Sequence, residues 1–597
     1  MTTQPDVPPT ITVPEGYSLH TENTSHILLP NDNGAFLNPV QEFNRDTSVA
    51  CIRTWGDQMN ELKKRKWEES RDKKAQKRLN KPKRQKKEET EDIVMAEQST
   101  SEQTADAAED NAEPPVEGGQ TETPKPEYTP QKFVVLEALS ATGLRSIRYV
   151  LANDLSPSAA EAMRRNVELN GLGPTPAEES SNEPSSSDIK KPQKAGLGKV
   201  RVNEGDACAL MYNHRAGKDR VDVVDLDPYG TAAPFIDAAV QCVNDGGLLC
   251  VTCTDLSVLA TANYPEKCYS NYGGIPVKAE YCHEAALRLA LNTISTSAAR
   301  YGRHIQPLLS LSIDFYIRVF VRVTTSPIEV KKIASKTAMY YVCTNCQSFY
   351  EQPLGRIVEK VHEASGNVNL LFKTHSGPPV GDRCPECNSV LHIAGPMWSG
   401  PIHDAEFVTK VLEHVENNES SYGTVARMKG MLTVAKEELQ APFYFTPSKV
   451  ASFFHCECPP LDDVASALLH AGHEISRSHA CPGSLKTTAS RVDIHDIFRS
   501  WVKKHPVKMD KISENSPARA LLAKEPKYAA YAPVVSLLAH LSYFNRTEAN
   551  FTHHPRSVTR SSKVKLVRYQ QNPLPNWGPG TKAKSGTKRK REQGEEE

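Results

Sequence analysis

The sequence predicts a doubly wound α/β domain, in which helices flank a mainly parallel sheet, followed by a C-terminal α+β domain. Short apolar segments of strand length alternate with segments of helical length between residues 133 and 323, a pattern typical of parallel sheets. The clearest strand is 221–227, which stops at Pro228-Tyr229-Gly230, a turn that cannot extend it. Beyond residue 330 the alternation ends and two Cys-x-x-Cys motifs appear.

The length and composition narrow the class of protein. A chain of 597 residues exceeds what one hydrophobic core normally holds, so we expect two or more domains. Its 72 Lys and Arg residues balance 72 Asp and Glu residues, although the charges are segregated along the chain. Its 14 cysteines, without a secretory signal, favour a reducing compartment. No apolar run is long enough to cross a bilayer, so the sequence predicts a soluble intracellular protein.

Shifts in composition suggest where the domains begin and end. The expected segments are 1–56, the N-terminal part of the α/β domain; 57–130, a charged insertion; 131–330, the rest of the α/β domain; 331–552, the α+β domain; and 553–597, a basic tail that is mostly disordered.

The segment 57–130 is rich first in Lys and Arg and then in Glu, Asp, Thr and Pro. Such a composition buries too little apolar surface to fold, so we expect it to be disordered. A solvated charged helix over Lys63–Arg78 is the alternative. The basic half is a candidate nuclear address or nucleic-acid tether. A second disordered insertion is expected at 171–198, which is rich in Pro and Ser.

Acidic residues follow several predicted strands, at the sheet edge where open α/β sheets bind ligands. A strand over 133–137 leads into small residues at 138–145, and Asp154 ends the next strand. That arrangement is typical of nucleotide-binding sites in which the acid accepts ribose hydroxyls. Asp206 follows a third strand, where it can accept from an adenine amino group or, alternatively, cap a helix.

The segment Asp227-Pro228-Tyr229-Gly230 brings a carboxylate, a rigid turn and an aromatic ring to this edge. A planar amine can stack on Tyr229 while Asp227 accepts its N–H bonds. An ordinary strand end with a tight turn is the alternative. A fifth strand at 247–252 and a hairpin of 305–313 and 315–323 complete the expected sheet.

Two cysteine pairs beyond residue 330 predict a zinc site. Each Cys-x-x-Cys motif places two thiolates on one tight turn, and four thiolates complete a tetrahedral Zn²⁺ site with no open position. We therefore expect a structural role for the metal. The ligands are Cys343, Cys346, Cys384 and Cys387.

The end of the second domain suggests a nucleic-acid module. An amphipathic helix over 461–470 precedes a strand at 473–477 and the basic segment Lys486-Thr487-Thr488. A helix followed by a basic wing resembles a winged-helix module. A generic α+β core is the alternative.

The acidic strand ends, the small-residue turn and the Asp-Pro-aromatic corner together fit the fold of S-adenosylmethionine-dependent methyltransferases. The full set of motifs resembles the tRNA (guanine-26-N2)-dimethyltransferase family over most of the chain outside the two insertions. Leu37 departs from the aromatic residue that the family often has there. The matching segments are Phe36–Pro39, Asn44–Asp46, Leu139–Arg148, Ala152–Asp154, Gly205–Ala207, Asp225–Gly230, Gly395–Asp404 and Asn572–Pro579.

This resemblance implies a Rossmann-like class I methyltransferase that adds two methyl groups to the N2 amine of guanine 26, at the junction of the D and anticodon stems of tRNA. The implied catalytic residues are Asp227, Pro228 and Tyr229. The implied contacts with S-adenosylmethionine are Arg45, Arg145, Asp154, Asp206 and Ala207. The cysteines match the family's zinc ligands. We expect a nuclear protein, with a mitochondrial pool as an alternative, and no obligate protein partner.

Two other classes of function share parts of this pattern. Amino methyltransferases that act on adenine in DNA or RNA, or on protein glutamine, use the same Asp-Pro-aromatic corner. A non-catalytic RNA-binding protein with a relic cofactor fold is the second class. A relic has no physical need for Arg145, Asp154, Asp206 and Asp227 together, which favours an enzyme.

Overall fold

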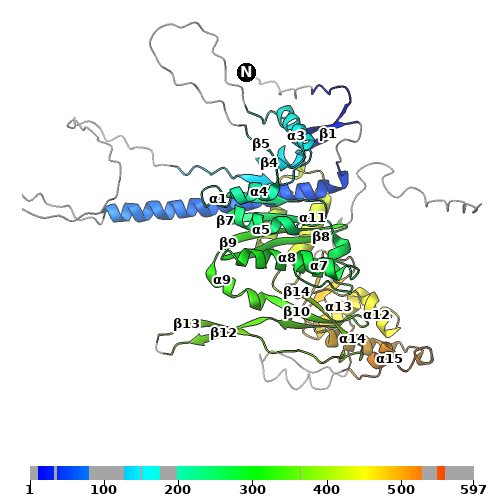
Figure 1. The fold of residues 1–597 in the computed structure, drawn as a ribbon. Helices are drawn as coiled ribbons and strands as arrows, with labels where there is room; N and C mark the ends of the chain where they lie inside the picture. The colour runs from blue at the N-terminus through cyan, green and yellow to red at the C-terminus, as the bar shows by residue number, and fades with distance from the viewer. Residues whose placement is uncertain are drawn as a thin grey trace, which may run out of the picture. The chain divides into compact units, whose positions relative to one another are not determined.

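The structure, a computed structural model, describes residues 11–31, 37–79, 127–147, 151–174, 198–363, 365–526 and 548–557 (Figure 1). Most of the predicted insertion at 171–198, residues 80–126 of the other insertion and most of the basic tail lie outside the described residues. The described residues up to Trp55 and from Phe133 onward belong to one compact unit, and those of 56–132 form another.

A seven-stranded sheet with the order β5-β4-β3-β6-β7-β9-β8 forms the centre of the larger unit. Strands β5 to β7 pair in parallel, and β9 runs antiparallel between β7 and β8. The order reverses between β3 and β6, which is the switch point where doubly wound sheets bind ligands. The predicted α/β fold is confirmed. The strands are β3 (Val135–Glu137), β4 (Leu151–Asp154), β5 (Arg201–Glu204), β6 (Val221–Leu226), β7 (Val243–Cys253), β8 (Arg303–Ile313) and β9 (Tyr316–Thr325).

Helices connect the strands and pack on the sheet, as Figure 1 shows for α5 and α8. Helix α3 starts where Ser156 caps it and a proline fills its first position, both favourable at a helix N-terminus. Helix α8 is buried over most of its length because it packs on β8 and β9 and also on β14 (Leu391–Trp398). The helices are α2 (Leu144–Ile147), α3 (Pro157–Leu169), α4 (Ala207–Asn213), α5 (Ala233–Cys242), α6 (Leu256–Leu259), α7 (Pro265–Tyr272), α8 (Cys282–Ala299) and α9 (Pro327–Lys331).

The N-terminal segment forms the hairpin of β1 (Tyr17–Glu22) and β2 (Ser25–Pro30), followed by the long helix α1 (Glu42–Leu79). The chain is therefore helical through Leu79, which contradicts the disorder expected from residue 57 and agrees with the alternative of a charged helix over Lys63–Arg78. Lys, Arg and Glu are strong helix formers, so low hydrophobicity alone did not indicate disorder. In the smaller unit Trp67 packs on Tyr128, with ring centroids 6.0 Å apart.

The segment after residue 330 contains the three-stranded sheet β11-β10-β14 and two separate hairpins. Its core is continuous with that of the α/β domain: Phe443 stacks on Tyr281 at 4.4 Å and meets Tyr340 at 5.0 Å. The change in sequence pattern at residue 330 therefore does not mark a break in the hydrophobic core. The elements not yet given are β10 (Thr337–Cys343), β11 (Phe349–Pro353), β12 (Gly355–Val361), β13 (Val368–Thr374), α10 (Ala405–Asn417), α11 (Val425–Glu437), α12 (Pro447–Phe454) and α15 (Pro517–Leu522).

The expected winged module corresponds to α13 (Leu461–His470), the short hairpin β15 (Ile475–Arg477) and β16 (Leu485–Thr487), and α14 (Arg491–Lys504). Lys486, which was expected on a basic wing, is fully buried and pairs with Glu284 at 3.2 Å and Glu438 at 3.3 Å. This hairpin therefore belongs to the core and cannot present Lys486 to a nucleic acid. Across the described residues, we find no helix that is both long and apolar enough to cross a membrane.

Candidate active site

A cavity of about 420 Å³ opens at the carboxyl edge of the sheet, around the switch point between β3 and β6. Residues after β3, β4, β6 and β7 line it, together with the start of α1. The lining residues are Leu37, Asn38, Gln41, Arg45, Glu137, Leu139, Ser140, Ala141, Thr142, Leu144, Arg145, Asp154, Asp227, Pro228, Tyr229, Phe235 and Thr254.

The carboxylate of Asp227 is held in place from two sides. Arg145 pairs with its Oδ2 atom, and the side-chain amide of Asn44 donates to the same oxygen at 3.5 Å. Within the described residues, no hydrogen bond is formed to Oδ1. The Asp227 side chain is 13% exposed, so Oδ1 can accept a hydrogen bond from a ligand in the cavity.

Beneath Asp227 lies a buried network of two arginines and two further acids. Arg318 contacts both oxygens of Asp225, at 2.8 Å and 3.0 Å. Arg145 contacts Asp225 at 3.1 Å and Glu137 at 3.5 Å. Burial raises the pKa of Asp225, but Arg318 and Arg145 outweigh it, so the net pKa is lowered. Asp225 therefore remains charged and fixes both guanidinium groups.

Glu137, at the end of β3, shows the opposite balance. Burial raises the pKa of Glu137 to about 8, and the charges of Asp225 and Asp227 add to that effect. Arg145 and a hydrogen bond from Ser146 oppose it without cancelling it. A carboxyl group that is protonated near neutral pH thus lies in the wall of the cavity.

Tyr229 is 81% exposed although its ring lines the cavity, whereas Pro228 is buried. The turn that carries them is pinned at Gly230, whose N–H donates to Thr254 Oγ1 at 2.7 Å. Gly230 has a φ of +85°, which glycine adopts without strain. The ring is thus presented by a fixed backbone and is free to stack on a ligand.

Asp154 lies at the other side of the cavity, at the end of β4. Its carboxylate accepts from the backbone N–H of Ala141 at 2.9 Å and from that of Ser156 at 3.0 Å. Ala141 has a φ of +49°, so the small-residue turn after β3 is locked against β4 by this acid. A carboxylate has about four acceptor positions, which leaves Asp154 able to bind a ligand as well.

Asp206 and Ala207 are not among the residues that line the cavity. Asp206 caps α4 and accepts from the N–H groups of Cys208 at 3.1 Å and Ala209 at 3.3 Å. Asp206 therefore caps a helix, which was the alternative role expected for it. Its contact with a cofactor stays a prediction.

Arg45 lines the cavity but is anchored away from it. Its guanidinium group donates to Glu22 on β1, with an Nε–Oε2 distance of 2.7 Å. Burial raises the pKa of Glu22, but hydrogen bonds from His20 and Arg45 outweigh this effect and lower it to about 2. The ion pair ties the start of α1 to the N-terminal hairpin.

The sequence interpretation gave no role to Asn44, Glu137 or Arg318, all of which the structure places in or beneath the site. Asn44 was visible only as part of the Asn44-Arg45-Asp46 motif. Arg318 lies between apolar residues in the buried part of β9, and a buried arginine needs an acid as a partner. That rule could have linked Arg318 to Asp225.

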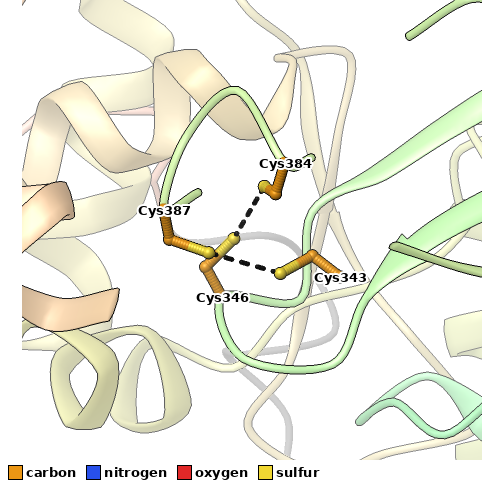
Figure 2. Close-up of side chains that lie close together, drawn as sticks. All are labelled: Cys343, Cys346, Cys384 and Cys387. Atoms are coloured by element: carbon orange, nitrogen blue, oxygen red, sulfur yellow. Dashed lines mark hydrogen bonds between the residues drawn. The ribbon is translucent and has the colours of Figure 1, made fainter. Parts of the chain in front are cut away.

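The four predicted metal ligands converge at a second place, on the loops after β10 and before β14 (Figure 2). All four cysteines are buried, and their sulfur atoms lie within 4.8 Å of one another. The Sγ atoms of Cys343 and Cys387 are 3.3 Å apart, and those of Cys346 and Cys384 are 3.6 Å apart. Thiolates bound to zinc at about 2.3 Å lie about 3.8 Å apart in a tetrahedron, so the cluster fits Zn²⁺ far better than two disulfides.

The doubly wound sheet and the acid-and-aromatic cavity at its switch point place the protein in the class of α/β methyltransferases. In fold, the chain is similar to a solved structure of Trm1 from Pyrococcus horikoshii in complex with S-adenosyl-L-methionine, with a TM-score of 0.54 and 23% sequence identity. The alignment covers 80% of this chain and 98% of that one.

The chain belongs to the N2,N2-dimethylguanosine tRNA methyltransferase family, whose sequence model matches residues 16–499. It is 41% identical to the tRNA (guanine(26)-N(2))-dimethyltransferase of Schizosaccharomyces pombe, over 94% of this chain and 92% of that protein. It is 39% identical to the human enzyme of the same name, over 95% of this chain and 78% of that protein. The mitochondrial enzyme of Saccharomyces cerevisiae is also 39% identical, over 95% and 92% of the two chains.

Proposed function

We infer that the protein transfers two methyl groups in turn from S-adenosylmethionine to the N2 amine of guanine 26 in tRNA. The observation that carries this inference is the Asp227 carboxylate, which lines the cavity and is held through one oxygen only, in a chain of this family. The related enzymes are named for this activity, and they match nearly the whole length of the chain.

The chemical difficulty is the weak nucleophilicity of the amine, because its lone pair is delocalised into the guanine ring. Asp227 Oδ1 accepts one N–H of the amine and turns the lone pair toward the methyl donor. Tyr229 stacks on the base and fixes its plane. Orientation of two reactants can lower a barrier by up to about 7–11 kcal/mol, and uptake of the departing proton by Asp227 or water is a smaller addition.

S-adenosylmethionine supplies a methyl group on a sulfonium centre, which needs no further activation. Asp154 fits the ribose hydroxyls because its carboxylate lies in the cavity wall next to the turn at Ala141. Arg145 lines the same cavity. We propose that its main role is to hold Asp227 and Asp225, with the cofactor as an additional contact.

We propose that Cys343, Cys346, Cys384 and Cys387 bind a structural Zn²⁺ ion. Each cysteine pair lies on a turn closed by a backbone hydrogen bond, of which Gln347 N–H to Cys343 O at 3.0 Å is one. The second turn is joined to α14, because Glu386 accepts from Arg499 at 2.7 Å. The metal would therefore fasten the last helices to the β11-β10-β14 sheet.

The substrate must be bound by surfaces beyond the cavity, and we propose the junction of the D and anticodon stems as the recognised region. For localisation, one related enzyme is mitochondrial. We propose a mainly nuclear protein because of the basic runs at residues 63–66 and 588–591. A fluorescent fusion with either run neutralised, observed by microscopy, tests this proposal.

The activity is tested by incubating purified protein with unmodified tRNA and a labelled methyl donor, followed by mass spectrometry of the nucleosides. The expected products are N2-methylguanosine and then N2,N2-dimethylguanosine, located at position 26. Label in N6-methyladenosine would instead identify an adenine methyltransferase. A tRNA with adenine at position 26 is the matched control and should stay unlabelled.

A further inference from the structure

Phe315 is an exposed aromatic residue for which neither the fold nor the cavity accounts. Its side chain is 78% exposed, although phenylalanine is normally buried. It lies with Asp314 in a two-residue turn between β8 and β9, whose last paired residues are Ile313 and Tyr316. Packing of the hairpin does not require an aromatic residue in this turn, because β8 and β9 are already buried along most of their length.

The topology brings this turn to the same edge of the sheet as the active site. β9 runs antiparallel to β7, with Ile317 opposite Cys253, and Thr254 next to Cys253 lines the cavity. Neighbouring strands lie about 4.8 Å apart, so the turn is about 10 Å along the edge from the end of β6. Phe315 therefore lies beside the cavity and outside its wall.

The turn is held rigidly from below. Asp314 has a φ of +40°, a strained conformation for a residue other than glycine. Arg427 on α11 pairs with its carboxylate at 2.7 Å. Arg427 also lies over the ring of Phe43 at 4.6 Å, next to Asn44, which contacts Asp227. The position of Phe315 is thus tied to the elements that position the catalytic carboxylate.

We propose that Phe315 enters the base stack of the RNA where the target guanine has left it. This inference rests on the proposed function, because a guanine within a stacked stem must be extruded before its N2 amine can reach Asp227. Tyr229 takes one face of the extruded base. Phe315 is too far along the edge to share that base, and apolar side chains that enter a stack hold it open. It is a positioning residue, since it acts on the RNA next to the target.

The test uses a tRNA transcript with 2-aminopurine at position 26, a base that keeps the 2-amino group and becomes fluorescent when unstacked. At saturating wild-type protein we expect a rise in fluorescence. In Phe315→Ala the rise should be largely lost, and kcat/KM for ordinary tRNA should fall by about 5- to 150-fold, the range for loss of one aromatic stack. Phe315→Tyr should retain both properties.

The controls separate this role from a general loss of affinity or folding. Phe372→Ala removes an exposed phenylalanine on β13, outside this edge, and should behave as wild type. Binding of S-adenosylmethionine should be unchanged in Phe315→Ala. A full fluorescence rise in Phe315→Ala at saturation, with or without weaker binding, would overturn the inference. Absence of dimethylguanosine from the wild-type reaction would instead overturn the proposed function.

Discussion

Asp225 and Asp227 lie two residues apart at the end of β6, yet their different surroundings indicate different roles. Asp225 is fully buried and bound by two arginines. Asp227 is partly exposed, and both of its contacts are formed by one oxygen. A fully buried carboxylate between two arginines supports the structure, whereas a partly exposed one with an acceptor oxygen to spare can bind substrate.

Replacing Asp227 by Ala should lower kcat by at least about 100-fold, while the affinities for tRNA and S-adenosylmethionine change little. The reason is that its bond to the amine strengthens as the methyl group moves across. Asp227→Asn should be no more active than Asp227→Ala. Its amide oxygen would turn toward the donors Arg145 and Asn44, which leaves an NH₂ group facing the amine. Single-turnover kinetics and calorimetric titration measure both effects.

The internal control is Asp225→Ala. Removing one partner of a buried ion pair typically costs about 3–5 kcal/mol, so this variant should unfold at lower urea concentration and show no selective loss of kcat. A folded, inactive Asp225→Ala beside an active Asp227→Ala would show that the wrong carboxylate has been assigned.

Replacing Asp154 by Ala should weaken binding of S-adenosylmethionine by about 1–3 kcal/mol, the penalty for unpaired polar groups. Part of that loss should come from release of the turn at Ala141, whose N–H the carboxylate holds. Asp154→Asn keeps an acceptor for that N–H and should lose less. Equal affinity for all three proteins by calorimetry would remove Asp154 from the cofactor site.

The raised pKa of Glu137 predicts a pH-dependent effect of Glu137→Gln. The folded pKa of about 8 lies above the value of 4.5 for an unburied Glu, so the folded state binds more protons than the unfolded state between these values. Wild-type stability should therefore fall as pH rises through this window. Gln mimics the protonated group, so its stability relative to wild type should grow by about 2–3 kcal/mol between pH 6 and pH 8.5. Urea unfolding at both pH values measures the difference, and a pH-independent difference would contradict the assignment.

At the scale of elements, the buried strands were predictable because their apolar runs and stops leave few alternatives. Helix α13 (461–470) agrees with the sequence prediction to the residue, and strand β6 (221–226) ends one residue before the expected Asp227. The extent of α1 was not predictable, because a charged surface helix and a disordered segment have nearly the same composition. The contacts Arg318–Asp225 and Lys486–Glu438 join residues far apart in sequence, so no local pattern contains them.

The cysteine loops allow a prediction at this scale. Cys384→Ser should abolish stoichiometric zinc and destabilise the β11-β10-β14 sheet with α14, because metal binding and local folding are coupled. Cys458→Ser, at an exposed cysteine outside the cluster, is the matched control and should keep its zinc. Elemental analysis and hydrogen exchange of β10 and β14 measure the two effects. A wild-type protein that is folded without metal would contradict the proposed site.

At the scale of the whole molecule, the active site is assembled mainly from three stretches that are distant in sequence. The segment 37–45, the strand ends at 137–154 and the corner at 227–229 meet in one cavity. Residues 80–126 separate the first stretch from the second in the sequence and lie outside the described residues. The insertion was expected at 57–130; the described residues of 56–132 form a separate unit, in which α1 is helical through Leu79.

Deleting 80–126 and joining the ends with a flexible Gly/Ser linker should therefore leave kcat within about twofold of wild type at saturating tRNA and low salt, since a segment without apolar surface builds no pocket. The basic residues at 81–87 can still add affinity for phosphates. If they do, KM for tRNA should rise on deletion, and the plot of log affinity against log salt should become shallower by about 0.7–0.9 for each lost phosphate contact. Deletion of 88–126 alone, which spares those residues, should leave the slope unchanged. The longer deletion would contradict this prediction if it abolished turnover at saturating tRNA while S-adenosylmethionine binding stayed normal. Part of 80–126 would then belong to the substrate site, and the insertion would begin later than residue 80.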